Sequence, residues 1–242
     1  MRFNHFLLAG AMLAASMFTA APALAAVTVN PDGSVTFDSS GGPNSVDIIY
    51  NGLGGDPTAV LTPGLSAILT LTLSSISGIN FNFLYSLQNT STVANTRISG
   101  FGFDVNPNVT GASSTGVFDQ FALNGHFASQ GNAETCFSGG PGACPQSNPI
   151  NSIGFGATGA GSLALIFAGP QSSVTLSNFL DRYQGFSTTN ISGGAVTSAI
   201  GRGSSVPAVP EPATWAMMLL GFGGMGVALR RRRRGLALPQ VA

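Results

Sequence analysis

The segment Ala67–Ser74, AILTLTLS, and the segment Asn80–Leu87, NFNFLYSL, decide the fold. In both segments large apolar residues alternate with Ser, Thr and Asn. An extended backbone therefore carries its apolar side chains on one face and its polar ones on the other. Gly, Pro, Asn and Ser interrupt the alternating segments, and these residues favour turns. The pattern predicts antiparallel β-structure with one buried and one solvated face.

The same alternation recurs along the middle of the chain, and it predicts further strands at Ser34–Asp38, Arg97–Val105, Ser162–Ala168 and Ser173–Phe179. The last two segments are joined through Gly169-Pro170-Gln171, which predicts a β-hairpin. Between the two termini no stretch has apolar residues at helical spacing over three turns. We therefore expect an all-β domain over residues 26–190, built as an antiparallel β-sandwich of jelly-roll-like form.

The composition changes over residues 191–209, which are rich in Gly, Ala, Ser, Val and Pro. Such a composition is typical of a flexible linker, because small residues leave the backbone many conformations. We therefore expect this segment to be a spacer that holds the β-domain away from the C-terminal region.

Charged residues are scarce, and lysine is absent. Between Val27 and Pro207 three arginines stand against eight acids, which gives this part of the chain a net charge of −5 at neutral pH. Nucleic-acid binding depends on clustered basic side chains, which this part of the sequence lacks. The charge therefore predicts no nucleic-acid partner, and it also disfavours adsorption to anionic lipid.

Residues 1–25 predict a secretory signal peptide. Arg2 precedes an apolar stretch at Phe6–Phe18, and Ala23 and Ala25 form an A-x-A cleavage site. Thirteen apolar residues are short for a membrane span, so a cleaved leader is favoured over a retained anchor. The expected export partners are the Sec translocon and signal peptidase, and the mature chain is expected to begin near Ala26.

The C-terminal region has the features of a membrane-inserted tail. An apolar stretch at Ala213–Leu229 has 17 residues, or about 26 Å of helix, enough to cross a thin hydrocarbon core. Trp215 lies where aromatic residues anchor at the membrane interface. A run of arginines then stops transfer and keeps the C-terminus in the cytoplasm; it comprises Arg230, Arg231, Arg232, Arg233 and Arg234.

The tripeptide Pro210, Glu211 and Pro212 stands directly before this predicted transmembrane helix. Two interpretations follow from the residues alone. The tail is either a permanent anchor or a recognition signal, in which the two prolines hold the chain extended for a membrane protease.

Residues 210–234, PEPATWAMMLLGFGGMGVALRRRRR, resemble the PEP-CTERM sorting domain in its alphaproteobacterial variety. The PEP tripeptide, the WAMM start of the helix, the glycine-rich span and the arginines occur in that order. The resemblance implies that an exosortase recognises the PEP tripeptide and cleaves nearby, so that membrane attachment is transient and the domain reaches the cell surface or extracellular matrix. Residues 235–242 extend past the arginines as a short cytoplasmic tail, whereas such proteins often end there.

Cys136 and Cys144 predict a disulfide, because paired cysteines in an exported chain usually oxidise. A metal site is the rival interpretation, but two thiols without a nearby His or third Cys are a poor ligand set. The cysteine segment Glu134–Pro145, with Ser99–Val109 and Val174–Gln184, also resembles a small PEP-CTERM family called cistern. That family label implies no activity.

Motifs for catalysis are absent from the sequence, which has no G-x-S-x-G, H-E-x-x-H or phosphate-binding G-x-x-x-x-G-K. His126 is the one histidine left after leader cleavage, and its Asn-Gly-His-Phe context favours a surface turn. Asp32 and Asp104 precede residues that offer further oxygen ligands, but turn capping accounts for them better than calcium does. We therefore expect no cofactor, no metal and no enzymatic activity.

The expected function is that of a surface or matrix structural protein, placed in or on an exopolysaccharide layer. One alternative is a carbohydrate-binding module, in which Tyr50, Tyr85, Tyr183 or some phenylalanines would stack on sugar rings. The other is a secreted hydrolase, which would need a cleft with paired carboxylates or a metal.

Overall fold

The computed structural model describes residues 27–38, 44–54, 60–127, 130–140, 144–145, 151–206 and 222. Its strands are β1 (Val27–Val29), β2 (Val35–Asp38), β3 (Asn44–Gly54), β4 (Val60–Ser77), β5 (Asn80–Asn89), β6 (Arg97–Asn106), β7 (Gly111–Ser114), β8 (Gln120–His126), β9 (Asn132–Ser138), β10 (Thr158–Ile166), β11 (Ser173–Thr189) and β12 (Ala195–Val206). Among these residues no helix is long and apolar enough to span a membrane. The predicted transmembrane segment Ala213–Leu229 lies outside the described residues except for Phe222.

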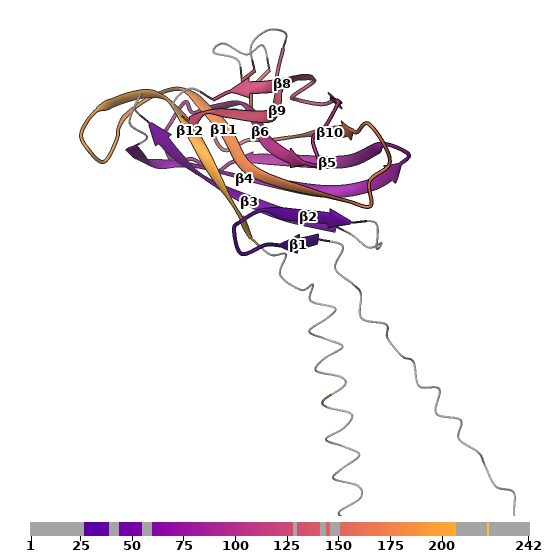
Figure 1. The fold of residues 1–242 in the computed structure, drawn as a ribbon. Helices are drawn as coiled ribbons and strands as arrows, with labels where there is room; N and C mark the ends of the chain where they lie inside the picture. The colour runs from indigo at the N-terminus through magenta and orange to yellow at the C-terminus, as the bar shows by residue number, and fades with distance from the viewer. Residues whose placement is uncertain are drawn as a thin grey trace, which may run out of the picture.

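The strands form one antiparallel sheet in the order β7-β10-β5-β4-β3-β12-β11-β6-β9-β8, and the β1–β2 hairpin joins it through β11. The two end strands of this order, β7 and β8, follow each other in the chain and contact each other. The sheet therefore curls around a single core and nearly closes (Figure 1). The all-β, antiparallel prediction is confirmed, although the described strands belong to one continuous sheet and not to two stacked ones.

Curvature comes from bulges in the long strands. The pairing register shifts between Leu73 and Ser75 in β4 and between Gln184 and Thr188 in β11. A bulge adds an unpaired residue to one strand, which bends it and increases its twist. A single sheet that bends in this way can bury its own apolar face. The alternating sequence pattern therefore does not require the two stacked sheets of a sandwich.

The alternation of apolar and polar residues decides which face of each of these strands is buried. In β4, Leu69 and Leu71 are fully buried while Thr70 between them is partly exposed, and in β5 Phe81 and Phe83 are buried in the same way. The core is rich in edge-to-face aromatic pairs, such as Phe37 and Phe83, whose ring centroids are 5.0 Å apart. The strands predicted at Ala67–Ser74 and Asn80–Leu87 are therefore confirmed, with their apolar residues inside.

Tyr85 links the two ends of the sheet. Its hydroxyl donates to the Thr115 carbonyl at 2.9 Å and accepts a hydrogen bond from the Phe118 amide at 2.9 Å. Both partners lie in the connection between β7 and β8, where the sheet edges meet. The buried ring stands close to Phe101 of β6 and to Phe118. A single side chain of β5 therefore fixes the connection that brings the edges together.

The predicted hairpin between Ser162–Ala168 and Ser173–Phe179 is wrong. Both segments are strands, but β10 pairs with β5 and β7, while β11 pairs with β2, β6 and β12. Phe167 follows the last residue of β10. It is buried and packs against Phe81 on β5. The chain then crosses to another part of the curled sheet, where β11 pairs with β2, β6 and β12.

The predicted spacer over residues 191–209 is also wrong for most of its length. Residues Ala195–Val206 form β12, which pairs with β11 on one side and β3 on the other, near the middle of the sheet order. The domain therefore extends to Val206. The small residues of this segment suggested a linker. In the structure they make room for the large inward side chains of the neighbouring strands β3 and β11.

Those side chains form a polar cluster in the core. Asp181 lies opposite Gly201 in the β11–β12 ladder, and Tyr50 lies opposite Gly203 in the β12–β3 ladder. Tyr183, two residues after Asp181, is on the same face. A Cβ atom on Gly201 would overlap Asp181 Oδ1 and crowd the Tyr183 ring. The bare backbone of β12 thus makes room for the three side chains of its neighbours.

The Asp181 carboxyl is fully buried, and neither oxygen has a hydrogen bond of standard geometry among the described residues. The buried hydroxyls of Tyr50 and Tyr183 are likewise unpaired there. Burial raises the pKa of Asp181 to about 8, because a charge in the core loses its hydration. Burial, and then the Asp181 charge, raise the pKa of both tyrosines. At neutral pH the carboxyl is therefore mostly protonated.

Gly201→Ala is expected to destabilise the protein by about 1 to 3 kcal/mol, since the new methyl group displaces the Asp181 carboxyl in a packed core. The control is Gly169→Ala, where a Cβ would meet nothing within 4 Å, and it should change stability by less than about 0.5 kcal/mol. Urea denaturation of the two variants measures both values. Equal losses in the two would contradict the packing role of Gly201.

Stability should also depend on the ionisation of Asp181. Its folded-state pKa, about 8, lies above the ordinary value of 3.8, so the folded state binds the proton more tightly than the unfolded state. The stability from this group is complete below about pH 4 and is lost as pH rises toward 8, by up to about 1.4 kcal/mol per pH unit. Asp181→Asn should remove this decline in denaturation curves across that interval. Asp119→Asn, at an exposed position, should keep it, and a decline retained in Asp181→Asn would refute the assignment.

Candidate functional site

Most residues predicted to act in export and sorting lie outside the described part of the chain. They are the signal cleavage residues Ala23 and Ala25, the sorting residues Pro210, Glu211, Pro212 and Trp215, and the arginines Arg230 to Arg234. Their position relative to the domain is nevertheless informative. β12 ends at Val206, so only residues 207–209 separate the sheet from Pro210. The PEP tripeptide therefore follows the last strand of the domain almost directly in the sequence.

The predicted disulfide is present between Cys136 of β9 and Cys144, with Cα atoms 5.9 Å apart. Both cysteines belong to a second, smaller buried cluster with Phe127, Leu180 and Ile200. Leu180 and Ile200 alternate with the inward residues Asp181 and Gly201, so this cluster covers the outer face of β11 and β12.

Hydrogen bonds fasten the cysteine segment to its surroundings. The His126 amide donates to the Cys144 carbonyl at 3.1 Å, and Arg182 Nη1 donates to the Pro145 carbonyl at 3.2 Å. Burial lowers the pKa of the Arg182 guanidinium. The disulfide thus joins β9 to a segment that shields part of the outer sheet face.

The one histidine among the described residues, His126, has a structural contact. His126 is exposed at the end of β8, and its Nδ1 lies 2.9 Å from Oδ1 of Asn132 on the neighbouring strand β9. Neither an acid nor a serine hydroxyl is among its hydrogen-bond partners in the described part of the chain. The arrangement is that of a cross-strand pair in a hairpin, and it has no nucleophile to activate.

The described carboxylates that were candidates for calcium binding or catalysis accept hydrogen bonds from backbone amides. Asp32 accepts hydrogen bonds from the amide and the hydroxyl of Ser34, at 2.9 and 2.7 Å, which is the predicted turn cap. Asp104 accepts from the Glu134 amide at 2.8 Å, and Glu134 in turn accepts from the amides of Val105 and Val109. Their oxygens therefore stabilise β6, β9 and the loop after β6.

The tyrosines proposed to stack on sugar do not reach the surface. Tyr50 and Tyr183 are 0% exposed and Tyr85 is 2% exposed. All three point into the core because they occupy inward positions of β3, β5 and β11, so this part of the carbohydrate-binding hypothesis is wrong. Two phenylalanines of the domain are exposed instead, Phe121 on β8 at 45% and Phe155 at 52%.

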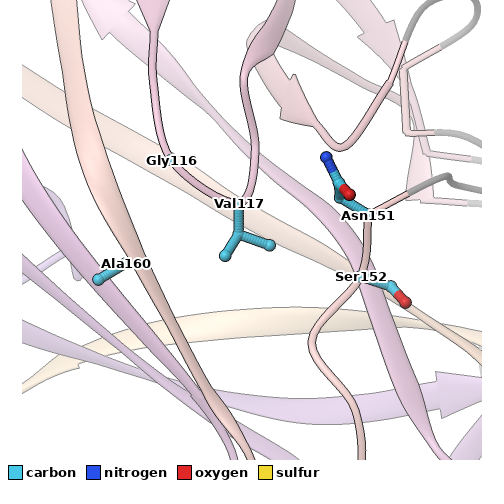
Figure 2. Close-up of a pocket in the computed structure, with 5 residues that line it drawn as sticks. All are labelled: Gly116, Val117, Asn151, Ser152 and Ala160. Atoms are coloured by element: carbon cyan, nitrogen blue, oxygen red, sulfur yellow. The ribbon is translucent and has the colours of Figure 1, made fainter.

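Two open pockets show different chemistry. The first, of about 520 Å³, is lined by Gly116, Val117, Asn151, Ser152 and Ala160. Figure 2 shows the Val117 side chain in the space between Ala160 and the Asn151–Ser152 segment. None of these five residues is ionisable, so this pocket offers neither an acid–base group nor a charged ligand-binding group.

The second pocket, here called the Phe155 pocket, has about 540 Å³ and is lined by Ala94, Asn95, Thr96, Arg97, Gly154, Phe155 and Gly185. It combines an aromatic ring, a guanidinium and a primary amide. Sequence inspection did not single out Phe155, because an isolated Phe between two glycines looks like an ordinary loop residue. The nearest signal was the turn sequence Gly-Phe-Gly itself.

The fold and the tail together define an exported β-domain followed at once by a C-terminal sorting signal. Residues 208–233 match the model of the PEP-CTERM protein-sorting motif. No match to the chain was found among curated proteins or solved structures. The chain therefore carries a PEP-CTERM protein-sorting signal, and this signal implies export, a membrane-anchored precursor and processing toward the surface by an exosortase, itself a membrane protein. The narrower resemblance to the cistern family stays a prediction.

Replacement of both cysteines, Cys136→Ser with Cys144→Ser, is expected to lower the free energy of unfolding by about 2 to 3 kcal/mol, because opening the short loop restores entropy to the unfolded chain. Denaturant unfolding of the oxidised protein and of the double variant measures this difference. Treating the wild-type protein with a thiol reductant under denaturing conditions before refolding should reproduce the loss. No difference between oxidised and reduced proteins would show that the disulfide does not stabilise the fold.

Proposed function

We propose that this protein is a structural component of the cell surface or extracellular matrix, without catalytic activity, and that it resides in or on an exopolysaccharide layer. The observation that carries the proposal is the sorting motif at 208–233, which begins directly after the last strand of a folded β-domain. In this proposal the Sec route exports the chain, signal peptidase cleaves after Ala25, and the exosortase cleaves near Pro210 to Trp215.

The outer face of the sheet supports a role among hydrated polymers. Thr70 donates to Asp47 at 2.6 Å, Thr72 to Ser45 at 3.1 Å, and the hydroxyls of Thr115 and Ser162 are 2.8 Å apart. Two of these three are pairs of hydroxyls, and together with the Thr70–Asp47 contact they make this part of the surface polar with few charges. Hydrogen bonding to polymer hydroxyls from this surface is far less sensitive to salt than ion pairing would be.

The described polar residues support the absence of catalysis. His126, Asp104 and Glu134 each have structural partners, and Asp181 is sealed in the core. A hydrolase of the glycosidase type would need two accessible carboxyl groups facing each other across a cleft. The two open pockets described above contain no carboxyl group among their lining residues.

A second candidate function is carbohydrate binding, and the Phe155 pocket favours it. Exposed aromatic rings can pack against the apolar face of a sugar, while nearby amide and guanidinium groups bond its polar substituents. This activity is compatible with residence in a polysaccharide matrix and would give the surface protein a specific attachment.

The processing steps predict two defined ends. Intact-mass spectrometry of the protein from its native host should show a start near Ala26 and an end between Pro210 and Trp215, and the protein should fractionate with the extracellular material. In the same strain without its exosortase, the protein should keep Arg230 to Arg234 and remain in the membrane fraction. A full C-terminus in both strains would mean a permanent anchor and would overturn the proposed surface role.

A further inference from the structure

The Phe155 pocket joins three segments that are distant in the sequence: the loop before β6, the turn before β10 and the bulged part of β11. We propose that it binds a carboxylated sugar residue, a uronic acid unit of an acidic polysaccharide. This inference rests on the second candidate function above and specifies its ligand. The argument has three parts, which concern the aromatic ring, the guanidinium and the space between them.

The aromatic ring is held out by a fixed turn. The Ala157 amide donates to the Gly154 carbonyl at 3.1 Å, and Gly156 has φ +68, so Phe155 is the second residue of a β-turn. Ile153, just before the turn, is buried and exchanges two backbone hydrogen bonds with Ile98 on β6, at 2.9 and 3.0 Å. An apolar ring that is 52% exposed on such an anchored turn is a preorganised contact surface.

The guanidinium is the available cation of the domain. Of the three arginines in the described residues, Arg182 donates to the Pro145 carbonyl and Arg202 donates to Gln130 Oε1 at 2.6 Å. Arg97 is exposed, and its guanidinium has no hydrogen bond or ion pair within the described residues. Its charge is therefore free to form charge-assisted hydrogen bonds with an incoming anion, and the planar group favours a carboxylate.

Gly185 keeps the space open. It lies in the bulged part of β11 with φ +77, and a Cβ at this position would meet Arg97 Nε at 2.9 Å and the Asn95 carbonyl at 3.2 Å. Any larger residue would therefore push the guanidinium away. Asn95 itself has φ 63 and is exposed among the lining residues, and an asparagine amide can offer both a donor and an acceptor to sugar hydroxyls.

These groups match a uronic acid unit better than a neutral sugar or a simple anion. The C–H face of the sugar ring can lie on Phe155, its carboxylate can bind Arg97, and a hydroxyl can reach Asn95. About 540 Å³ is within the range of small-ligand pockets. Because the domain carries a net negative charge, long-range attraction is absent, and recognition of an acidic chain must depend on this local contact.

The probe for the test is a trimer of galacturonic acid, added to the full-length chain in detergent, with Kd measured by microscale thermophoresis. Wild-type protein should bind it, and should bind a neutral galactose trimer and acetate at least about fivefold more weakly. Arg97→Gln and Phe155→Ala should each weaken binding of the acidic trimer about fivefold or more, and added salt should weaken wild-type binding.

Matched controls use the other exposed residues of the same types. Arg202→Gln removes an exposed arginine that is already bonded, and Phe121→Ala removes an exposed ring on β8; each should change Kd by less than about twofold. Only variants that still unfold cooperatively are compared. If Phe155→Ala does not fold, Phe155→Leu is measured in its place. The proposal is overturned if the neutral trimer binds as well as the acidic one, if acetate binds equally well, if no probe binds, or if the controls weaken binding as much as Arg97→Gln.

This result is separable from the proposed surface role. If the protein is found in the extracellular material but the acidic trimer does not bind, the ligand assignment fails while the surface role stands. If the protein stays in the membrane fraction of the native host, the surface role fails whatever the trimer does.

Discussion

The central constraint in this structure is that the last strand of the domain lies within the sheet and not at its edge. β12 pairs with β3 and β11, and it admits the inward side chains of both neighbours because Gly201 and Gly203 carry none. Tyr50 and Tyr183 are thereby buried beside Asp181. In the strand order, β12 lies between β3 and β11. The last strand of the domain therefore joins the two parts of the sheet. Residues 27–206 consequently form one unit, and a truncation before Ala195 would expose the interior along two strands.

This arrangement brings the folded domain and its sorting signal close together. The motif match begins at residue 208, two residues after β12 ends at Val206. Val206 at the end of β12 pairs with Asp47 of β3, so the neighbouring ends of these two strands are the part of the sheet that adjoins the motif in the sequence. In the proposed surface role, the outer face, with its hydroxyl pairs and few charges, would be presented to a polymer matrix.

Several features followed from local sequence. Alternation in Ala67–Ser74 and Asn80–Leu87 predicted both strands and their buried faces, since every second side chain of a strand must share one environment. Two cysteines in an exported chain predicted the disulfide, and the order PEP, apolar span and arginines indicated the sorting signal, because membrane insertion and recognition depend on contiguous residues. The interpretation of residues 191–209 from their composition was wrong. Small residues indicated a linker, but Gly201 and Gly203 lie in β12, where neighbouring side chains leave no room for a Cβ atom.

The sequence by itself thus determined the strand class, the buried and exposed faces of the strands with clear alternation, the disulfide and the sorting tail. Each depends on residues that are adjacent or regularly spaced. Only the tertiary structure decided that β10 and β11 do not pair, that β12 completes the sheet, and that the candidate tyrosines are buried while Phe155 lies exposed beside Arg97. Strand partners are chosen by competition among apolar faces from the whole chain, and a pocket is made by side chains from segments far apart in sequence. Neither is encoded in any single stretch of residues.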